Sequence, residues 1–327
     1  MRGFNSKFYE FQALNSFSKS SSVMINIKIP DANKLPEEWL EIDGVIIKNG
    51  KLEVCIEVKS FPIFDKDIEN ILKKFNILKE KGYSFGDYTI VAPQFHIKKT
   101  YDINLVTFLP NINFIKKFYE NYEPELPDLF INKLGWHHFR FQSPFAERSF
   151  KNQVDKRLTT TNKLKREIHN RLSWPPLRVF WSVLMYLSPK ELFFSNSKGY
   201  PLGGPIFIDI DCTMFHYPCI IKNGICDKGL KIVENESKKL IDILIENDYS
   251  EIYRVFSGRK GFHFYIFDTK GKRKSDMIKE RVNLVNMILK ERIKIDAKKT
   301  TDIKLTTSFP TSLNGISLKE VKIMNKY

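Results

Sequence analysis

Residues 207–211 read FIDID, which places the carboxylates of Asp209 and Asp211 two positions apart in an apolar run. Side chains alternate across a β-strand, so residues two apart lie on the same face. Two adjacent carboxylates repel each other unless a cation lies between them, and a divalent metal is the usual cation. The pattern predicts a buried strand that carries a metal site; the alternative is a solvated strand end.

A second segment, EIYRVFSGRKGFHFYIF, follows at residues 251–267. It predicts two apolar strands, Ile252–Phe256 and Phe262–Phe267, joined by the turn SGRKG. The turn and the second strand supply a hydroxyl and up to three cationic groups: Ser257, Arg259, Lys260 and His263. This composition suits the phosphates of a nucleoside triphosphate. The alternative is a hairpin with a solvated basic turn.

A third carboxylate, Asp296, lies in IDAKKTTD and precedes a further strand and the turn of FPTSLNG, residues 309–315. In this order, FIDID, SGRKGFH, IDAKKTTD and FPTSLNG resemble the motifs of the archaeo-eukaryotic primase superfamily, in particular the small catalytic subunit of DNA primase. The resemblance covers about residues 111–327. Upstream, KKFYENYEPELPDLFINKLGWHHFRF is similar to the start of that catalytic domain, and WPPLRVFWSVLMYLSP, residues 174–189, to a helix before its first catalytic strand.

The resemblance implies a primase or polymerase that joins nucleotides on a single-stranded DNA template, in DNA replication or repair. It implies that Asp209, Asp211 and Asp296 hold Mg²⁺ or Mn²⁺. It further implies that the nucleotide's phosphates contact Ser257, Arg259, Lys260 and His263. The implied partners are the template, nucleoside triphosphates, and a primase large-subunit-like protein or helicase.

Three positions depart from the motifs of this superfamily. Ser308 stands where a basic residue is expected, Asn314 where a His is expected, and His137 where an Arg is common. Lys298 and Lys304 are candidate substitutes for the missing basic group. The departures leave open two alternatives: an inactive, DNA-binding relative, or a metal-dependent nuclease whose primase-like half only binds DNA.

A Cys/His-rich segment, DCTMFHYPCIIKNGICDKG, lies between the first two motifs at residues 211–229. Its metal-ligating side chains suit a small tetrahedral Zn²⁺ site, and they are Cys212, His216, Cys219 and Cys226. The alternative is a set of buried thiols, because free Cys packs like a small apolar residue.

The first 110 residues carry a separate constellation in EIDGVIIKNGKLEVCIEVKSF, residues 41–61. Two apolar strands flank an Asn-Gly turn, which predicts a hairpin that brings Asp43 close to Glu57 and Lys59. This resembles the PD-(D/E)xK nuclease superfamily, in which two carboxylates hold a metal and the Lys positions the attacking water. Glu10, on a preceding helix, is an additional candidate ligand. The alternatives are a salt-bridged edge strand, or a domain of this fold that only binds DNA.

The order of elements around the hairpin fits the same superfamily: a helix, a strand, the hairpin, an amphipathic helix at Asp67–Lys81 and a strand in DYTIVAP. We therefore expect an α/β (α+β) protein of two domains. Residues 1–110 would form a small nuclease-like mixed sheet with helices, and residues 111–327 a primase-like core of sheets flanked by helices.

Composition agrees with a nucleic-acid partner, since 53 Lys and Arg against 38 Asp and Glu give a net charge of +15. The alternative is solvated basic helix faces. No apolar run approaches the roughly 20 residues that span a bilayer, and the N-terminus lacks a signal peptide's apolar stretch. We expect a cytoplasmic protein with reduced thiols and no membrane partner.

Overall fold

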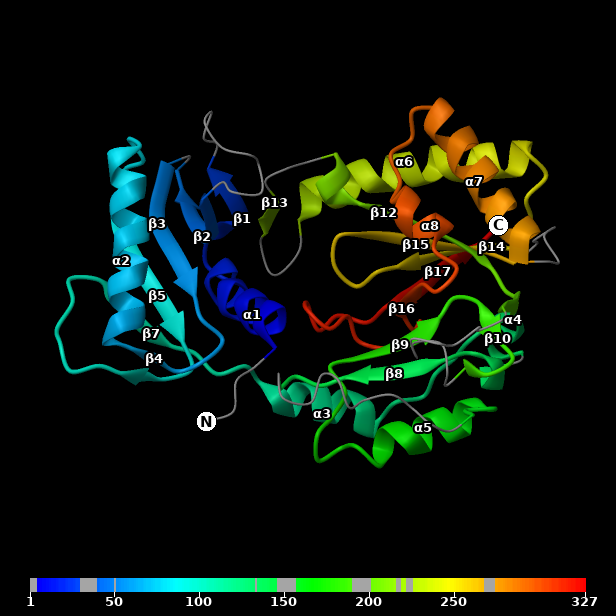
Figure 1. The fold of residues 1–327 in the computed structure, drawn as a ribbon, viewed down its shortest axis with the longest axis horizontal. Helices are drawn as coiled ribbons and strands as arrows, with labels where there is room; N and C mark the ends of the chain where they lie inside the picture. Colours follow the sequence, from blue (N-terminus) through cyan, green and yellow to red (C-terminus); the bar gives the residue numbers. More distant parts are fainter. Residues whose placement is uncertain are drawn as a thin grey trace. The chain divides into compact units, whose positions relative to one another are not determined.

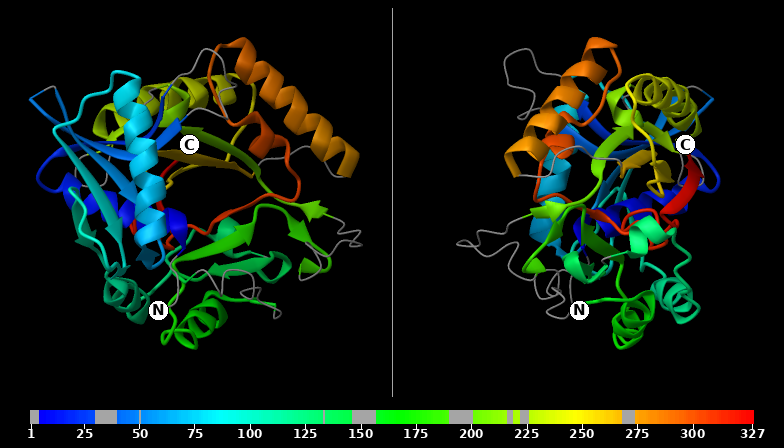
Figure 2. Two further views of the ribbon diagram at one scale, coloured as in Figure 1. Left: turned by 60° about the vertical axis from the view of Figure 1, so that its left-hand side comes forward. Right: turned by 90° about the vertical axis from the view of Figure 1, so that its right-hand side faces the viewer.

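The computed structural model describes residues 5–29, 40–49, 51–132, 134–145, 157–189, 201–215, 219–221, 226–267 and 274–327. The chain divides into two compact units. The first comprises Met1–Asn111, Phe145–Glu147 and Tyr217–Asp227, and the second comprises the remainder. The segment Tyr217–Asp227 therefore belongs with the N-terminal unit, although it follows the FIDID motif in the sequence. Figures 1 and 2 show the elements of each unit.

The first unit is built on a six-stranded sheet with the order β13-β1-β2-β3-β5-β7. Its strands are β1 (Ser22–Ile29), β2 (Leu40–Lys48), β3 (Lys51–Val58), β5 (Asp87–Ala92), β7 (Asn104–Thr107) and β13 (Cys219–Ile221). The pairs from β13 to β3 are antiparallel, whereas β3, β5 and β7 run parallel. A separate short pair joins β4 (Ile63–Phe64) to β6 (Phe95–His96).

Two helices cover opposite faces of this sheet. The apolar face of α2 (Asp65–Glu80) packs with Val45 of β2. The adjacent residue of β2, Gly44, is on the opposite face of the sheet and lies against Leu14 of α1 (Ser6–Ser18). The approach is so close that a Cβ on Gly44 would be 2.4 Å from the Leu14 Cδ2 atom. The predicted order of helices and strands is confirmed. The edge-strand alternative for β3 is wrong, because β3 lies between β2 and β5.

The second unit contains two antiparallel sheets. The four-stranded sheet has the order β12-β15-β14-β17 and the three-stranded sheet the order β16-β9-β8. Their strands are β8 (Phe139–Gln142), β9 (Arg178–Ser182), β12 (Ile206–Asp211), β14 (Ile252–Phe256), β15 (Gly261–Ile266), β16 (Thr306–Ser308) and β17 (Lys322–Lys326). A further pair joins β10 (Met185–Tyr186) to β11 (Pro201–Gly203).

Helices flank both sheets of the second unit (Figure 1). They are α3 (Ile112–Glu120), α4 (Asp128–Ile131), α5 (Thr161–His169), α6 (Asp227–Glu246), α7 (Lys274–Lys290) and α8 (Ala297–Thr301), with 3₁₀ turns at Leu134–Trp136 and Cys212–Met214 (η5). Aromatic rings join the sheets. The ring centroid of Trp181 on β9 lies 5.9 Å from that of Tyr265 on β15 and 5.9 Å from that of Phe130 on α4. This shared aromatic core holds the two sheets together.

The strands predicted around FIDID and SGRKGFH are confirmed as β12, β14 and β15. The helix expected at residues 174–189 is wrong, because these residues form β9 and β10. In β9, Val179 and Trp181 are buried while Arg178 and Phe180 are half-buried, which is the two-residue period of a strand. None of the described helices is both long and apolar enough to cross a bilayer.

Candidate active site

The two acidic residues of FIDID lie on β12 beside the strand that carries His263. Asp209 is paired with His263, and Asp211 with Gly261, across the β12–β15 ladder. A Cβ on Gly261 would lie 2.1 Å from the backbone oxygen of Ile210, so only glycine fits there. The close approach of the SGRKG turn to β12 therefore depends on this glycine.

A cavity of ≈320 Å³ opens at this end of the sheets. Its lining includes the predicted residues of the first two motifs, namely Asp209, Asp211, Ser257, Arg259, Lys260 and His263. Asp296 does not line the cavity, but its N–H donates to the backbone oxygen of Asp209 at 3.0 Å. The structure thus brings together residues that are up to 87 positions apart in the sequence, from Asp209 to Asp296.

Lys299 is the close cationic partner of Asp209, whose side chain is almost fully buried. The Lys299 Nζ atom contacts the Asp209 carboxylate and lies 3.2 Å from Oδ2 of Asp296. Asp296 is the N-cap of α8, and its side chain accepts a hydrogen bond from the Lys299 N–H at 3.0 Å. This bond fixes the position of the Lys299 backbone. Burial opposes the charge of Lys299, but Asp209 and then Asp296 outweigh it and raise the pKa of the ammonium.

Asp211 has a different set of partners. Its Oδ2 atom lies 3.2 Å from Nζ of Lys260, and its Oδ1 atom accepts from the backbone N–H and the hydroxyl of Thr213. Burial alone would raise the pKa of Asp211, but Lys260 and the Thr213 hydrogen bonds hold it below its usual value. This carboxylate is therefore ionised at neutral pH.

Two buried side-chain nitrogens of the cavity lining lack hydrogen-bond partners among the described residues: Nδ1 of His263 and Nε of Arg178. Burial lowers the pKa of His263 to about 4, so its imidazole is neutral, and its Nε2 atom lies 3.7 Å from Oδ1 of Asp209. Burial likewise lowers the pKa of Arg178 to about 10. A Cβ on Gly315 would lie 3.3 Å from the Arg178 Nε atom, so this glycine leaves room for the guanidinium. Buried nitrogens of this kind are usually hydrogen-bonded, to water or to a ligand where the protein supplies no partner.

The SGRKG turn is held in place by the 314–317 loop. Asn314 donates from Nδ2 to the backbone oxygen of Ser257 at 2.6 Å, and Ser317 donates from Oγ to that of Gly258 at 2.6 Å. Gly258 has a φ of +83°, and a Cβ there would lie 2.6 Å from Cβ of Asn314. Asn314, a departure from the superfamily motif, thus fastens the turn.

The other departures have different positions. Ser308 is buried on β16 and lines the cavity. His137 lies against Trp181 and is hydrogen-bonded to the backbone oxygen of Ser182, away from the cavity lining. The candidate substitutes Lys298 and Lys304 are exposed, and neither lines the cavity. Lys299, which the sequence analysis did not single out, is the lysine that reaches Asp209 and Asp296.

The residues present fit a hard divalent cation. Asp209, Asp211 and Asp296 supply oxygen ligands of the kind that Mg²⁺ and Mn²⁺ prefer. A single ammonium bridges two of these carboxylates, so the negative charge already attracts a cation at this point. In the described part of the chain, no group of three or more His, Cys, Asp or Glu side chains is close enough to form a ready metal site. Lys299 would have to move for a metal to contact both carboxylates.

The predicted zinc site cannot be followed through all four residues. His216 and the side chain of Cys219 lie outside the described residues. Cys212 is buried at the start of η5, and Cys226 is buried just before α6. The Zn²⁺ site stays a prediction.

The first unit brings its own predicted residues together on β2 and β3. Glu57, 3% exposed, contacts Nζ of Lys59 at 2.9 Å and Nζ of Lys74 at 2.5 Å. Asp43 accepts from the Val58 N–H at 2.7 Å. Burial, and then the Glu57 carboxylate, raise the pKa of Asp43 to about 6. Lys74, on α2, is a partner that the sequence analysis missed.

Glu10 lies on α1 and is half-buried. Its negative charge is among the influences that raise the pKa of Lys59, so it is near the other members of this group. Carboxylates and a lysine are therefore gathered at one end of β3. The group has the donor chemistry for a divalent cation, and metal binding here stays a prediction.

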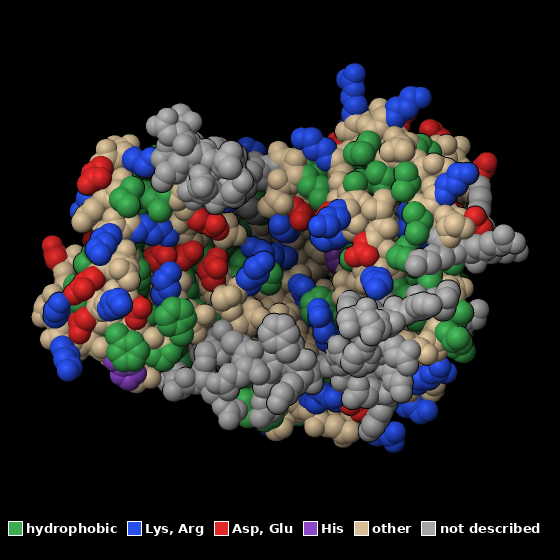
Figure 3. Space-filling view, viewed as in Figure 1, with side chains coloured by type: hydrophobic (Ala, Val, Ile, Leu, Met, Phe, Trp, Pro, Cys, Tyr) green, Lys and Arg blue, Asp and Glu red, His purple; other side chains and the backbone are tan. Residues whose placement is uncertain are grey.

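Some of the basic residues that give the chain its positive charge have partners within the chain. Lys74 and Lys299 contact carboxylates, and Arg281 of α7 is buried and donates to the backbone oxygen of Pro205 at 3.0 Å. On the face drawn in Figure 3, Lys and Arg side chains are spread out with Asp and Glu among them. Only part of the positive charge is thus available to a partner.

No protein-family model matches the chain, and no curated protein matches it. Among solved structures, it is similar to the polymerase domain of Ligase D from Mycobacterium tuberculosis in complex with DNA. The likeness has a TM-score of 0.38 and 11% sequence identity, and covers 65% of this chain and 79% of that one. These findings leave the nuclease-like interpretation of the first unit a prediction.

Proposed function

We propose that the second unit is a nucleotidyl transferase of the primase–polymerase kind, which adds nucleotides on a single-stranded DNA template. The observation that carries this proposal is the composition of the ≈320 Å³ cavity. Asp209 and Asp211 lie on β12, and a hydroxyl with cationic and neutral nitrogen groups lies beside them on the SGRKG turn and the neighbouring strand β15. A nucleoside triphosphate bound to a divalent metal matches both halves of this lining.

Asp209, Asp211 and Asp296 would hold Mg²⁺ or Mn²⁺. When bound, the metal would lower the pKa of the attacking hydroxyl and offset charge on the pyrophosphate leaving group. The chain's own donors would position the triphosphate. Lys260 and Arg259 supply positive charge beside it, while the neutral His263 offers a polar ring nitrogen without a counter-charge.

The test is nucleotide incorporation on a single-stranded DNA template, with and without a primer, in Mg²⁺ or Mn²⁺. Asp209→Asn keeps the size of the side chain but removes the charge, and we expect it to lower incorporation on the order of a thousand-fold. Glu57→Gln, a matched change in the first unit, should leave incorporation intact. Activity in the Asp209→Asn protein equal to wild type would exclude this cavity as the reacting centre. Lack of incorporation by wild type in every condition would favour a DNA-binding subunit.

A second activity is supported by the first unit. Glu57 is buried on an interior strand with two lysines and Asp43 around it, which suits a metal-dependent nuclease. Glu57→Gln should then abolish cleavage of DNA, while Asp209→Asn should spare it. Loss of both activities in either variant would contradict two independent centres.

A further inference from the structure

Arg178 lines the ≈320 Å³ cavity without a counter-charge from the described part of the chain. Its side chain makes no hydrogen bond or ion pair with a described residue, and its Nε atom is shielded from solvent. The two lysines of the lining differ, because Lys260 contacts Asp211 and Lys299 contacts Asp209. An anion that enters the cavity therefore finds at Arg178 a donor that no described carboxylate occupies.

The guanidinium of Arg178 is charged and lies among other positive groups. Burial, and then the positive charges of Arg259 and Arg140, lower its pKa to about 10, so it is still protonated at neutral pH. Burial is the main cause that lowers the pKa of His263, and the charge of Arg178 adds to this effect. These groups therefore lie within electrostatic range of one another. Buried positive charge of this kind is costly unless an anion compensates it.

The three-stranded sheet presents Arg178 to the cavity. Arg178 and Phe180 are two positions apart on β9, so they lie on the same face, and Phe180 is paired with Ser308 of β16. All three residues line the cavity. Arg178 is therefore the diagonal neighbour of Ser308 across two strands, a separation that a long side chain can span. A guanidinium on β9 is thus offered at the part of the sheet where Ser308 stands in place of a basic residue.

The ring of Phe180 supports the guanidinium without using its N–H groups. The Cζ atom of Arg178 lies 5.1 Å from the centroid of this ring, and that of Arg140 lies 4.8 Å from it. A cation above a ring is attracted by the ring's charge distribution, and its hydrogen-bond donors stay available. Arg140 is paired with Phe180 from β8 and is outside the cavity lining.

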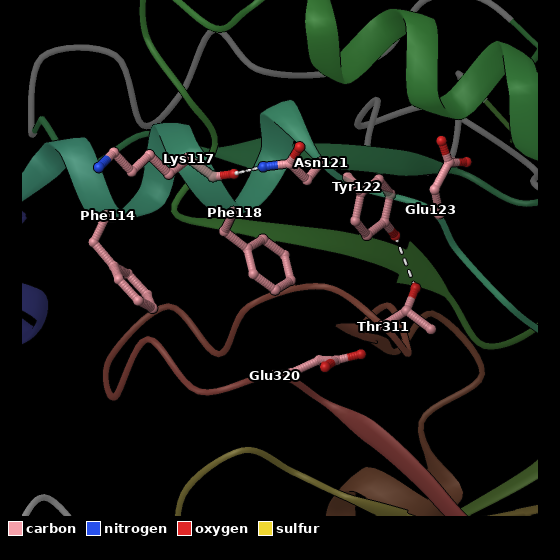
Figure 4. A pocket seen from close by; sticks show the side chains of 8 residues that line it. All are labelled: Phe114, Lys117, Phe118, Asn121, Tyr122, Glu123, Thr311 and Glu320. Atoms are coloured by element: carbon pink, nitrogen blue, oxygen red, sulfur yellow. Dashed lines mark hydrogen bonds between the residues drawn. The ribbon is translucent and has the colours of Figure 1, made fainter.

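A fixed loop lies against the same side chain. A Cβ on Gly315 would lie 3.1 Å from Cβ of Arg178 and 3.3 Å from its Nε atom. The segment that carries this glycine is fastened to the residues after α3, because the Tyr122 hydroxyl lies 2.9 Å from Oγ1 of Thr311 (Figure 4). Arg178 therefore has little side-chain freedom left to lose when a ligand binds.

We propose that Arg178 binds the terminal phosphate of the nucleoside triphosphate and so makes this cavity select triphosphates over diphosphates. This inference rests on the function proposed above and adds a residue that determines its substrate. A guanidinium offers a planar fork of N–H donors that matches two phosphate oxygens. Lys260 and Lys299 are engaged with Asp211 and Asp209, whereas Arg178 contacts no described carboxylate. Its ligand is thus the part of the triphosphate remote from these carboxylates.

A phosphate of a DNA strand is the other source of the same chemistry. A phosphodiester carries a single negative charge, whereas a terminal phosphate carries about two at neutral pH. Arg178, Arg259 and the imidazole of His263 all line one cavity of ≈320 Å³. Such a concentration of positive charge favours the more highly charged group.

The experiment measures binding of a nucleoside triphosphate and of the matching diphosphate, each labelled on the base, to the full chain in Mn²⁺ without a template. Wild type should bind the triphosphate more tightly. Arg178→Gln should weaken triphosphate binding on the order of thirty-fold and leave diphosphate binding unchanged, because only the contact to the terminal phosphate is lost. Arg140→Gln is the matched control, since it removes a guanidinium from the same Phe180 ring outside the cavity. That variant should bind both nucleotides as wild type does.

Arg178→Lys keeps the test valid if Arg178→Gln does not fold. It retains a positive charge but lacks the fork, so it should lose part of the preference for the triphosphate. Equal affinity of wild type for the two nucleotides, or an equal loss of both affinities in either variant, would overturn the proposal. Weaker binding of a single-stranded oligonucleotide by the variants, with nucleotide binding unchanged, would also overturn it and indicate a strand phosphate as the ligand.

Nucleotide incorporation separates this inference from the proposed function, because the binding experiment needs no turnover. If wild type fails to incorporate nucleotides while Arg178→Gln loses the preference for the triphosphate, the inference stands and the enzymatic proposal fails. If wild type incorporates nucleotides and Arg178→Gln does so with an unchanged KM for the triphosphate, the enzymatic proposal stands and the inference fails.

Discussion

The centre around Asp43 and Glu57 and the centre around Asp209 and Asp211 contain the same kinds of group: carboxylates on neighbouring strands and lysines that contact them. They distribute the cations differently. In the first unit, Lys59 and Lys74 both contact Glu57, and the pKa of Asp43 is raised to about 6. In the second unit, each carboxylate of the FIDID strand has its own lysine.

This difference teaches that the number of charges does not determine the protonation of a site. The first centre concentrates its cations on one carboxylate, so burial and repulsion act on the other. The second centre gives Asp211 a lysine of its own, Lys260, and the pKa of Asp211 falls. Asp43 is therefore suited to hold a proton near pH 6, and Asp211 to remain ionised.

The glycine beside each centre gives the largest expected contrast. Gly261→Ala would place a Cβ 2.1 Å from the backbone oxygen of Ile210 and 2.7 Å from Cα of Asp211, neither of which can yield locally. Gly44→Ala would meet the flexible end of Leu14 instead. We expect losses in the free energy of unfolding of more than about 3 kcal/mol and of about 1 kcal/mol, respectively. Urea denaturation measures both, and similar losses would show that the β12–β15 approach can relax.

The pH dependence of stability should have opposite signs in the two centres. The folded pKa of Asp43, about 6, exceeds its ordinary 3.8, so its stabilising effect is complete below about pH 4 and lost as pH rises through 6. The folded pKa of His263, about 4, is below its ordinary 6.5, so its effect is complete above pH 6.5 and lost as pH falls through 4.

Denaturation of wild type, Asp43→Asn and His263→Gln in a metal chelator from pH 4 to 8 measures this. Each difference from wild type should change by about 2 kcal/mol across its window. The free energy of unfolding of Asp43→Asn should rise relative to that of wild type as pH rises. The free energy of unfolding of His263→Gln should rise relative to that of wild type as pH falls. Two curves of the same sign would mean that the environments of these groups are alike.

A smaller effect concerns the lysines as competitors of a metal. Lys299→Met removes the ammonium between Asp209 and Asp296, so we expect Mn²⁺ to bind about ten-fold more tightly and the metal-free protein to be less stable. Lys298→Met is the control, because Lys298 is adjacent to Lys299 in the sequence and its side chain is exposed. Titration calorimetry measures the affinity. Weaker Mn²⁺ binding in Lys299→Met than in Lys298→Met would mean that Lys299 supports the metal instead of competing with it.

The sequence allowed the strands and most of the candidate site to be predicted. FIDID and SGRKGFH specify alternating apolar strands and a glycine turn, so β12, β14 and β15 follow from local rules. The approach of His263 to Asp209 is a long-range pairing of β12 with β15 and does not follow from either motif. Asp43, Glu57 and Lys59 were likewise accessible, because a two-residue turn brings the ends of a hairpin together.

The missed residues depend on longer-range geometry. Lys74 reaches Glu57 from α2, and Arg178 lies on a strand that resemblance alone had assigned to a helix. Lys299 could have been predicted from the sequence, because Asp296 is a residue type that favours the N-cap, and an N-cap side chain accepts from the N–H of the third residue after it. Apart from this rule, the sequence does not distinguish Lys299 from the adjacent Lys298.

The edge strand β13 determines when the N-terminal sheet can be completed during synthesis. Val23 of β1 is paired with Ile221, so about 200 residues must be translated after β1 before its partner exists. Until then, the free edge of β1 is open to strands of other chains. A fragment that ends at Asn111 would keep that edge permanently, so we expect it to aggregate more readily than the full chain.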